Sequence, residues 1–135
     1  MLDPAASLAL AEQVAQAAKQ LGFDTALIGA AALAVHRYTR GTDNPGRIVD
    51  TPAGAAIARA QPLPGSSLRC VTIEDLVALK LYAGGLADHA DIVQVLARNP
   101  EVDLAAVRDV AAPFDAGDHL EALIEQAASL GPRRR

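Results

Sequence analysis

The chain has 135 residues, a net charge of −4 and 51% hydrophobic residues, and these values exclude several classes of protein. Much of the hydrophobic fraction is alanine, and no uninterrupted apolar run approaches the ~18 residues of a membrane span, so we expect no transmembrane helix. The acidic balance disfavours a domain that binds nucleic acid over its whole surface, and the single cysteine excludes an intramolecular disulfide.

The first half of the chain has a strong helix signal followed by weaker strand signals. Proline after Asp3 and an apolar residue at every third or fourth position predict a helix that ends near Gly22. Residues 23–28 have the pattern of a short buried strand, and residues 30–38 have that of an apolar helix. Residues 47–50 are a second strand candidate.

The second half of the chain is predicted to be mostly helical. Thr72 and Asp75 have the spacing of a capping box, which predicts a helix that begins there and ends at Gly84. The other expected segments are a short helix over residues 53–60, a loop over 61–67, a strand over 68–73 and helices over 86–98, 103–112 and 118–130.

Together these elements predict a single domain of the α/β (α+β) class over residues 1–130. It should contain a small mixed sheet of about three strands and about five helices. Residues 131–135 form a basic C-terminal tail with Arg133, Arg134 and Arg135. Because the start of the chain has no basic segment followed by an apolar stretch, we expect a cytoplasmic protein.

Lys80 is the most informative charged residue, because its neighbours on the predicted helix are apolar. A lysine on such a helix must extend its amine to water or pair with an acid. Asp91 shares a helical stripe with Ile92 and Leu96, which places its carboxylate on an inward face. We therefore predict an ion pair between Lys80 and Asp91.

The other reactive side chains have simpler expected roles. His36 ends an apolar helix, where the backbone or solvent should satisfy its ring. His89 and His119 have no histidine or cysteine partner at the sequence spacing of metal ligands, so no zinc site is expected. Cys70 should be a small core residue rather than a nucleophile. Two aromatic residues are also expected in the core, Tyr82 and Phe114.

Two segments carry a resemblance to a known family. The first is residues 27–42, LIGAAALAVHRYTRGT, and the second is residues 71–81, VTIEDLVALKL, with the glycines and aspartates that follow up to residue 92. In this order they resemble the opening motif and the downstream lysine helix of nucleotidyltransferase-fold proteins, especially the abortive-infection toxin (AbiEii-like) branch. The resemblance implies a trimmed version of the nucleotidyltransferase fold.

The resemblance also implies which residues would contact a nucleotide. Gly29 and Ala30 would lie against the phosphates of a nucleoside triphosphate, and Arg40 and Thr42 would add further contacts. The catalytic positions of the family fall on Lys80 and Asp91. That pair is expected either to be purely structural or to be a retained site that touches the nucleotide.

The metal-binding part of the motif departs from the family pattern. The two carboxylates that hold Mg²⁺ on the triphosphate fall on Asn44 and Gly46, and neither residue can replace a carboxylate. Asp43 lies one position out of phase. Asp50 follows closely, either as the family's third carboxylate after an internal deletion or as a turn residue at the end of a strand. Asp43 and Asp50 are therefore the candidate metal ligands, and they would make a poor Mg²⁺ site.

These observations lead to one favoured functional hypothesis and two alternatives. The favoured one is an inactive nucleotidyltransferase-fold protein of toxin–antitoxin or abortive-infection type that acts as a nucleotide-binding or protein-interaction module. The first alternative is an active enzyme that uses Mg²⁺ to transfer a nucleoside monophosphate to RNA or protein. The second is an antitoxin-like protein that neutralises a complete toxin.

The small predicted sheet also indicates a protein partner. Its edges are close to its centre, and the segment that flanks this region in the family is missing here. Burial of the exposed apolar surface against another chain would add stability that a core poor in aromatic residues lacks. We therefore expect a homodimer or an obligate complex whose interface lies near residues 30–50.

Overall fold

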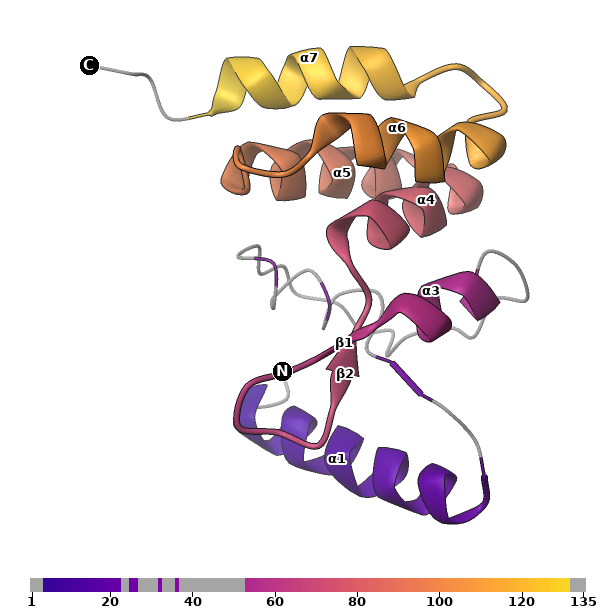
Figure 1. The fold of residues 1–135 in the computed structure, drawn as a ribbon. Helices are drawn as coiled ribbons and strands as arrows, with labels where there is room; N and C mark the ends of the chain where they lie inside the picture. The colour runs from indigo at the N-terminus through magenta and orange to yellow at the C-terminus, as the bar shows by residue number, and fades with distance from the viewer. Residues whose placement is uncertain (1–3, 23–24, 27–31, 33–35, 37–52, 132–135) are drawn as a thin grey trace.

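The computed structural model describes residues 4–22, 25–26, 32, 36 and 53–131. Over these residues the protein is helix-rich, with six α-helices, one short 3₁₀-helix and one two-stranded antiparallel sheet (Figure 1). The expected mixture of helices and a small sheet is confirmed at this level. Within the described segments, no helix is both long enough and apolar enough to cross a membrane.

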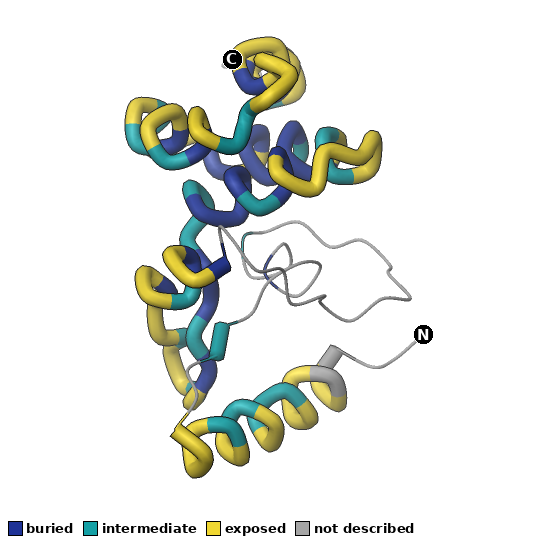
Figure 2. Tube along the Cα trace, turned by 90° about the vertical axis from the view of Figure 1, so that its right-hand side faces the viewer, coloured by how far each residue is buried: buried dark blue, intermediate teal, exposed yellow. Residues whose placement is uncertain are grey.

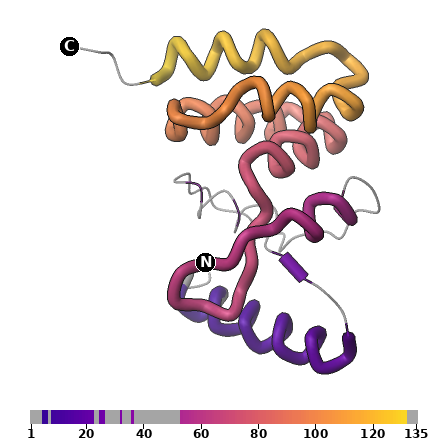
Figure 3. The backbone as a smooth tube through the Cα atoms, in the orientation of Figure 1, coloured from indigo at the N-terminus to yellow at the C-terminus, as the bar shows by residue number. Residues whose placement is uncertain are grey.

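Helix α1 (Pro4–Gln20) lies at the opposite end of the molecule from the last helices of the chain (Figure 3). It ends as predicted, because Gly22 adopts a left-handed backbone conformation with φ of 84°. The described side chains of α1 are half-buried or exposed. Ser66 donates a hydrogen bond to Glu12 over 3.0 Å, which connects α1 to the loop between the two strands.

The sheet consists of two very short strands, β1 (Gln61–Pro62) and β2 (Arg69–Cys70), in which Gln61 pairs with Cys70. The sequence prediction was wrong in two respects here. It assigned β1 to a loop, and it extended the second strand to residue 73. The second strand is shorter because Thr72 already caps the following helix. Proline is tolerated in β1 because a two-stranded sheet consists only of edges.

The other two expected strands lie wholly or mostly outside the described residues. Residues 47–50 lie outside the described residues. Of residues 23–28 only 25–26 are described, and these two are not in a strand. A sheet of about three strands therefore remains a prediction.

The rest of the described chain is helical, largely within the predicted bounds. The helices are α3 (Ala53–Arg59), α4 (Ile73–Ala83), α5 (Leu86–Arg98), α6 (Leu104–Ala111), the 3₁₀-helix η1 (Ala112–Phe114) and α7 (Leu120–Leu130). Helix α4 packs against α5, α6 and η1, and α7 covers α5 (Figure 1).

Local signals set the ends of these helices. The Thr72 hydroxyl accepts a hydrogen bond from the backbone N–H of Asp75 and so caps α4. Asp103 caps α6 in the same way, by accepting from two backbone N–H groups of the first turn. Gly84 ends α4 in a left-handed conformation with φ of 70°, which suits glycine. The predicted cap at Thr72 and the predicted glycine break are confirmed.

Helix α7 begins two residues later than predicted. Asp118 has a φ of 55°, so its backbone cannot be part of a right-handed helix. The cap comes instead from Asp115, whose carboxylate accepts hydrogen bonds from the N–H groups of His119 and Leu120. The sequence spacing suggested Asp118 as the start, whereas the structure uses the earlier aspartate.

The core lies among α4, α5, α6 and α7, where the helices turn their buried faces toward each other (Figure 2). Its fully buried side chains are mainly aliphatic and include Leu76, Val77, Ile92, Val95 and Val107. The expectation that Tyr82 belongs to this core was wrong. Tyr82 is 52% exposed and makes an edge-to-face contact with half-buried Phe114 at the end of the helical unit.

Candidate functional site

The candidate site is an ion-paired cluster at the turn between α4 and α5. The Lys80 amine lies 3.0 Å from Oδ2 of Asp91 and 3.3 Å from Oδ1 of Asp88. The lysine side chain is 10% exposed, that of Asp91 is 2% exposed and that of Asp88 is 24% exposed. The predicted pair between Lys80 and Asp91 is confirmed, and Asp88 is a second partner.

The two glycines between the helices create this cluster. Because α4 ends at Gly84 and α5 begins directly after Gly85, the two helices form a tight hairpin. Lys80 therefore lies in the last turn of α4, and Asp88 lies in the first turn of α5. Both positions are favourable for the helix dipoles, since a cation stabilises a helix C-terminus and an anion stabilises an N-terminus. Asp88 also accepts a hydrogen bond of 3.1 Å from the backbone N–H of Gly85.

The cluster contains one cation and two anions, which limits its chemistry. An amine that binds phosphate must offer its positive charge to the incoming oxygen atoms. At Lys80 two carboxylates already compensate that charge, and an approaching phosphate would meet the remaining negative charge. The arrangement therefore suits a structural clamp between two helices better than a triphosphate contact.

The other residues implied by the resemblance cannot be placed relative to this cluster. Gly29, Ala30, Arg40 and Thr42 lie outside the described residues, and so do both candidate metal ligands, Asp43 and Asp50. The nucleotide-binding and metal-binding roles stay predictions. The expected interface near residues 30–50 is not described either, apart from Ala32 and His36. In the described part of the chain, no three or more His, Cys, Asp or Glu side chains are grouped so that they could hold a metal ion.

A second feature is a pocket of about 310 Å³ beside the sheet, lined in part by His36, Cys70, Thr72 and Glu74. Nε2 of His36 lies 2.9 Å from the carbonyl oxygen of Val71, a hydrogen bond that requires the ring proton on Nε2. The backbone thus satisfies this histidine, as predicted. The contact fixes the ring at the edge of the pocket.

Asn99 also contacts the backbone of His36. This buried asparagine donates hydrogen bonds of 2.8 Å to the carbonyl oxygens of His36 and Val95. This link was not predicted from the sequence, because Asn99 before Pro100 indicated only the end of a helix.

Cys70 behaves as a core residue. It is buried, and burial raises the pKa of its thiol to about 11. Because the thiolate is the reactive form, we expect iodoacetamide at about pH 8 to alkylate the native protein roughly 100-fold more slowly than the urea-unfolded chain. Equal rates would contradict this assignment.

The same pKa shift predicts how stability changes with pH. The folded state holds the thiol proton more tightly than the unfolded state does. The resulting contribution to the free energy of unfolding is complete below the ordinary thiol pKa of 9.0 and is lost as pH rises toward about 11. The Cys70→Ala variant is the control, because it lacks the thiol but keeps every other ionisable side chain of the protein. The difference in the free energy of unfolding between the native protein and the Cys70→Ala variant should shrink or reverse as pH rises from 9.0 to about 11.

One further buried charge, that of Asp75, was not predicted from the sequence. The Asp75 carboxylate is 3% exposed and accepts hydrogen bonds from the Arg59 guanidinium, with Nε to Oδ2 at 3.0 Å, and from the Thr72 hydroxyl at 2.9 Å. The hydrogen bond to Asp75 raises the pKa of Arg59. This pair fastens α3 to α4. Asp75 was interpreted only as part of a cap, although its place on an apolar helix gave the same signal as Lys80.

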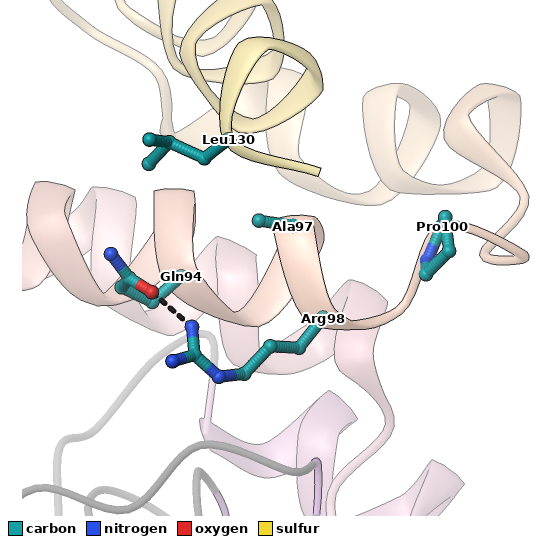
Figure 4. Close-up of a pocket in the computed structure, with 5 residues that line it drawn as sticks. All are labelled: Gln94, Ala97, Arg98, Pro100 and Leu130. Carbon is teal, nitrogen blue, oxygen red and sulfur yellow. Dashed lines mark hydrogen bonds between the residues drawn. The ribbon is translucent and has the colours of Figure 1, made fainter. Parts of the chain in front are cut away.

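A larger pocket of about 440 Å³ lies between the C-terminal ends of α5 and α7, and its lining residues include Gln94, Ala97, Arg98, Pro100 and Leu130 (Figure 4). The Arg98 guanidinium donates a hydrogen bond to the Gln94 side chain at its rim. This pocket is at the far end of α5 from Asp88. It therefore does not form one site with the charged cluster.

Comparisons with protein-family models, with curated proteins and with solved structures find no match to this chain.

Proposed function

We propose that this chain is a catalytically inactive protein of nucleotidyltransferase type, of the kind found in toxin–antitoxin and abortive-infection systems, and that it acts by binding a protein partner. The observation that carries the proposal is the pairing of Lys80 with Asp88 and Asp91. Lys80 and Asp91 stand where the resemblance puts a catalytic lysine and aspartate. Here two carboxylates compensate the lysine charge, and the cluster joins two helices.

The metal-binding motif supports the same conclusion. Asn44 and Gly46 occupy the positions of the carboxylate pair, and neither side chain offers the anionic oxygen that Mg²⁺ prefers. Transfer of a nucleotidyl group needs that metal to neutralise the triphosphate and to position the attacking oxygen. A chain without this carboxylate pair lacks the metal ligands that nucleotidyl transfer requires.

Nucleotide binding without catalysis is a second candidate, and the pocket beside His36 favours it. His36 lies in sequence between Ala30 and Arg40, which are the residues that the resemblance assigns to the nucleotide. The lining is mostly apolar and includes the acidic Glu74, which suits a base or a ribose better than a phosphate. A nucleotide-dependent rise in melting temperature without Mg²⁺ would support this candidate, and no rise with any of the common nucleotides would exclude it.

The first test is a transfer assay. We expect no label on RNA or protein after incubation with radiolabelled nucleoside triphosphates, Mg²⁺ or Mn²⁺ and mixed acceptors, because no carboxylate pair holds the metal. The Asp43→Ala and Asp50→Ala variants are the controls. Robust labelling that disappears in either variant would show that these aspartates bind metal after all, and the protein would be an active transferase.

The second test addresses the partner. The protein should be co-expressed with the product of the adjacent gene, and the complex should be sized by light scattering after gel filtration. A stable complex combined with no transfer activity supports the proposal. Separate elution of the two proteins, with transfer activity in the chain alone, would overturn it.

A further inference from the structure

A group of half-buried and exposed aromatic and aliphatic side chains lies at one end of the helical unit. We call it the bundle-end patch, and it consists of Tyr82, Leu86, His89, Phe114 and His119. Leu86 is 90% exposed and Tyr82 is 52% exposed. The rings of Tyr82 and Phe114 meet edge to face with centroids 6.2 Å apart, and the rings of His89 and His119 lie 4.9 Å apart. The patch therefore contains two ring pairs and a nearly free leucine.

The helix hairpin and the connection between α6 and α7 bring these residues together. Tyr82 lies at the end of α4 and Leu86 begins α5, whereas Phe114 and His119 belong to the segment that joins α6 to α7. Both connections lie at the same end of the unit (Figure 1). Residues some 30 positions apart in sequence thus share one surface.

The composition of the chain makes this placement unusual. The sequence has only two tyrosines and two phenylalanines, and Tyr82 and Phe114 are the ones that the described residues include. The described core is mainly aliphatic, whereas Tyr82 is exposed and Phe114 packs against the core with only part of its ring buried. Exposed aromatic rings, tyrosine in particular, are among the side chains that contribute most to binding energy at protein interfaces.

The charge around the patch restricts what could bind there. Residues 82–89 and 112–119 contain three aspartates, Asp88, Asp115 and Asp118, and no lysine or arginine. Lys80 compensates part of the charge at Asp88, whereas Asp118 is exposed and Asp115 is half-buried. Arg108, one turn before η1, is ion-paired with Glu121 over 2.6 Å. An acidic rim repels the phosphates of nucleic acid and attracts a cationic partner.

We propose that the bundle-end patch is the docking surface for a protein partner that presents an apolar anchor side chain flanked by lysine or arginine. This inference rests on the proposed function, because it identifies the surface and the chemistry of the partner through which the chain would act. The anchor would pack on Leu86 and the Tyr82 ring, and its basic neighbours would face the aspartates of the rim.

The test uses defined probes with the full-length chain. One is an amphipathic helical peptide with a leucine stripe flanked by lysines, the second is the same peptide with glutamates in place of the lysines, and the third is a short single-stranded RNA. We expect the lysine peptide to bind, to bind more weakly as salt is raised, and to shift the amide NMR signals of residues 82–89 and 112–119. The glutamate peptide and the RNA should not bind.

Two substitutions test the apolar and charged parts of the patch separately. Leu86→Gln should lower the affinity for the lysine peptide by about tenfold or more, as expected when an apolar anchor contact is lost. Asp118→Asn removes one rim charge, keeps a residue that tolerates the left-handed backbone, and should weaken binding to a smaller extent. The matched control is Leu130→Gln, because Leu130 is 59% exposed at the far end of α7.

Four outcomes would overturn the inference. These are equal binding of the two peptides, RNA binding at the patch, NMR shifts confined to other residues, and equal loss in the Leu86 and Leu130 variants. All of them are independent of the transfer assay. A chain that transfers nucleotides yet binds the lysine peptide at this patch would overturn the proposed function and leave the docking surface in place.

Discussion

Replacement of Lys80 by methionine should lower the free energy of unfolding by about 3–5 kcal/mol, which is the typical cost of removing one partner from a buried ion pair. The methionine has a similar length and fills the space of the lysine stem. However, it removes the lysine charge that faces the almost fully buried Asp91, and it leaves Asp88 with the Gly85 N–H. Urea unfolding followed by circular dichroism is the direct measurement.

A double-mutant cycle separates the interaction from the cost of burial. The Asp91→Leu variant alone should also be strongly destabilised, because it leaves the buried amine with Asp88 alone. The double variant should lose much less than the sum of the two single losses, since it replaces a buried pair by apolar side chains. Simple additivity would contradict a direct contact. The exposed pair of Arg108 and Glu121 is the control, and its coupling should be far smaller.

Truncation of Leu76 to alanine should destabilise the fold by about 2–5 kcal/mol. Leu76 lies on α4 at the centre of the helical core and is 1% exposed. Removal of its isobutyl group leaves a cavity that the surrounding helices can fill only in part. Thermal or urea unfolding measures the loss, and the fold should remain helical by circular dichroism.

The matched control is Leu86→Ala, which makes the same chemical change at a position that is 90% exposed. Its effect on the free energy of unfolding should stay within about 0.5 kcal/mol, as for most surface substitutions. Comparable losses in the two variants would mean that Leu86 is buried in solution, for example between two copies of the chain.

The parts of the fold that were predicted correctly depend on short-range signals. Thr72 and Asp103 cap helices through backbone groups within three residues, and Gly84 ends a helix by its own conformation. The pair of Lys80 and Asp91 was predictable for a similar reason. Each charge lies on an otherwise apolar helical stripe, and the glycines between them force a tight hairpin.

The parts that were missed depend on contacts between distant segments. Arg59 reaches Asp75 across the whole β-hairpin, and His89 meets His119 only because two connections lie at the same end of the helical unit. Tyr82 was assigned to the core because its helix is apolar. Its exposure depends on which neighbours cover the end of α4, and helical periodicity does not contain that information.

Of the candidate site, only the cluster formed by residues close together in the sequence was predictable. The cluster at Lys80 follows from two adjacent helices, whereas the nucleotide-binding turn and the metal ligands rest on the resemblance alone. Those residues, from Gly29 to Asp50, lie outside the described residues. Their roles depend on the assays above.

The short connections between the last helices have a consequence for folding kinetics. Two residues join α4 to α5, and residues 99–103 join α5 to α6. The 3₁₀-helix η1 follows α6 directly, and residues 115–119 join it to α7. Helices that meet near neighbours in sequence close small loops, which cost little entropy and form quickly. The segment from α4 to α7 should therefore collapse early and supply a surface on which α3 and the β-hairpin fold later. The Arg59–Asp75 contact, which spans that hairpin, would then form after the helical unit rather than direct its assembly.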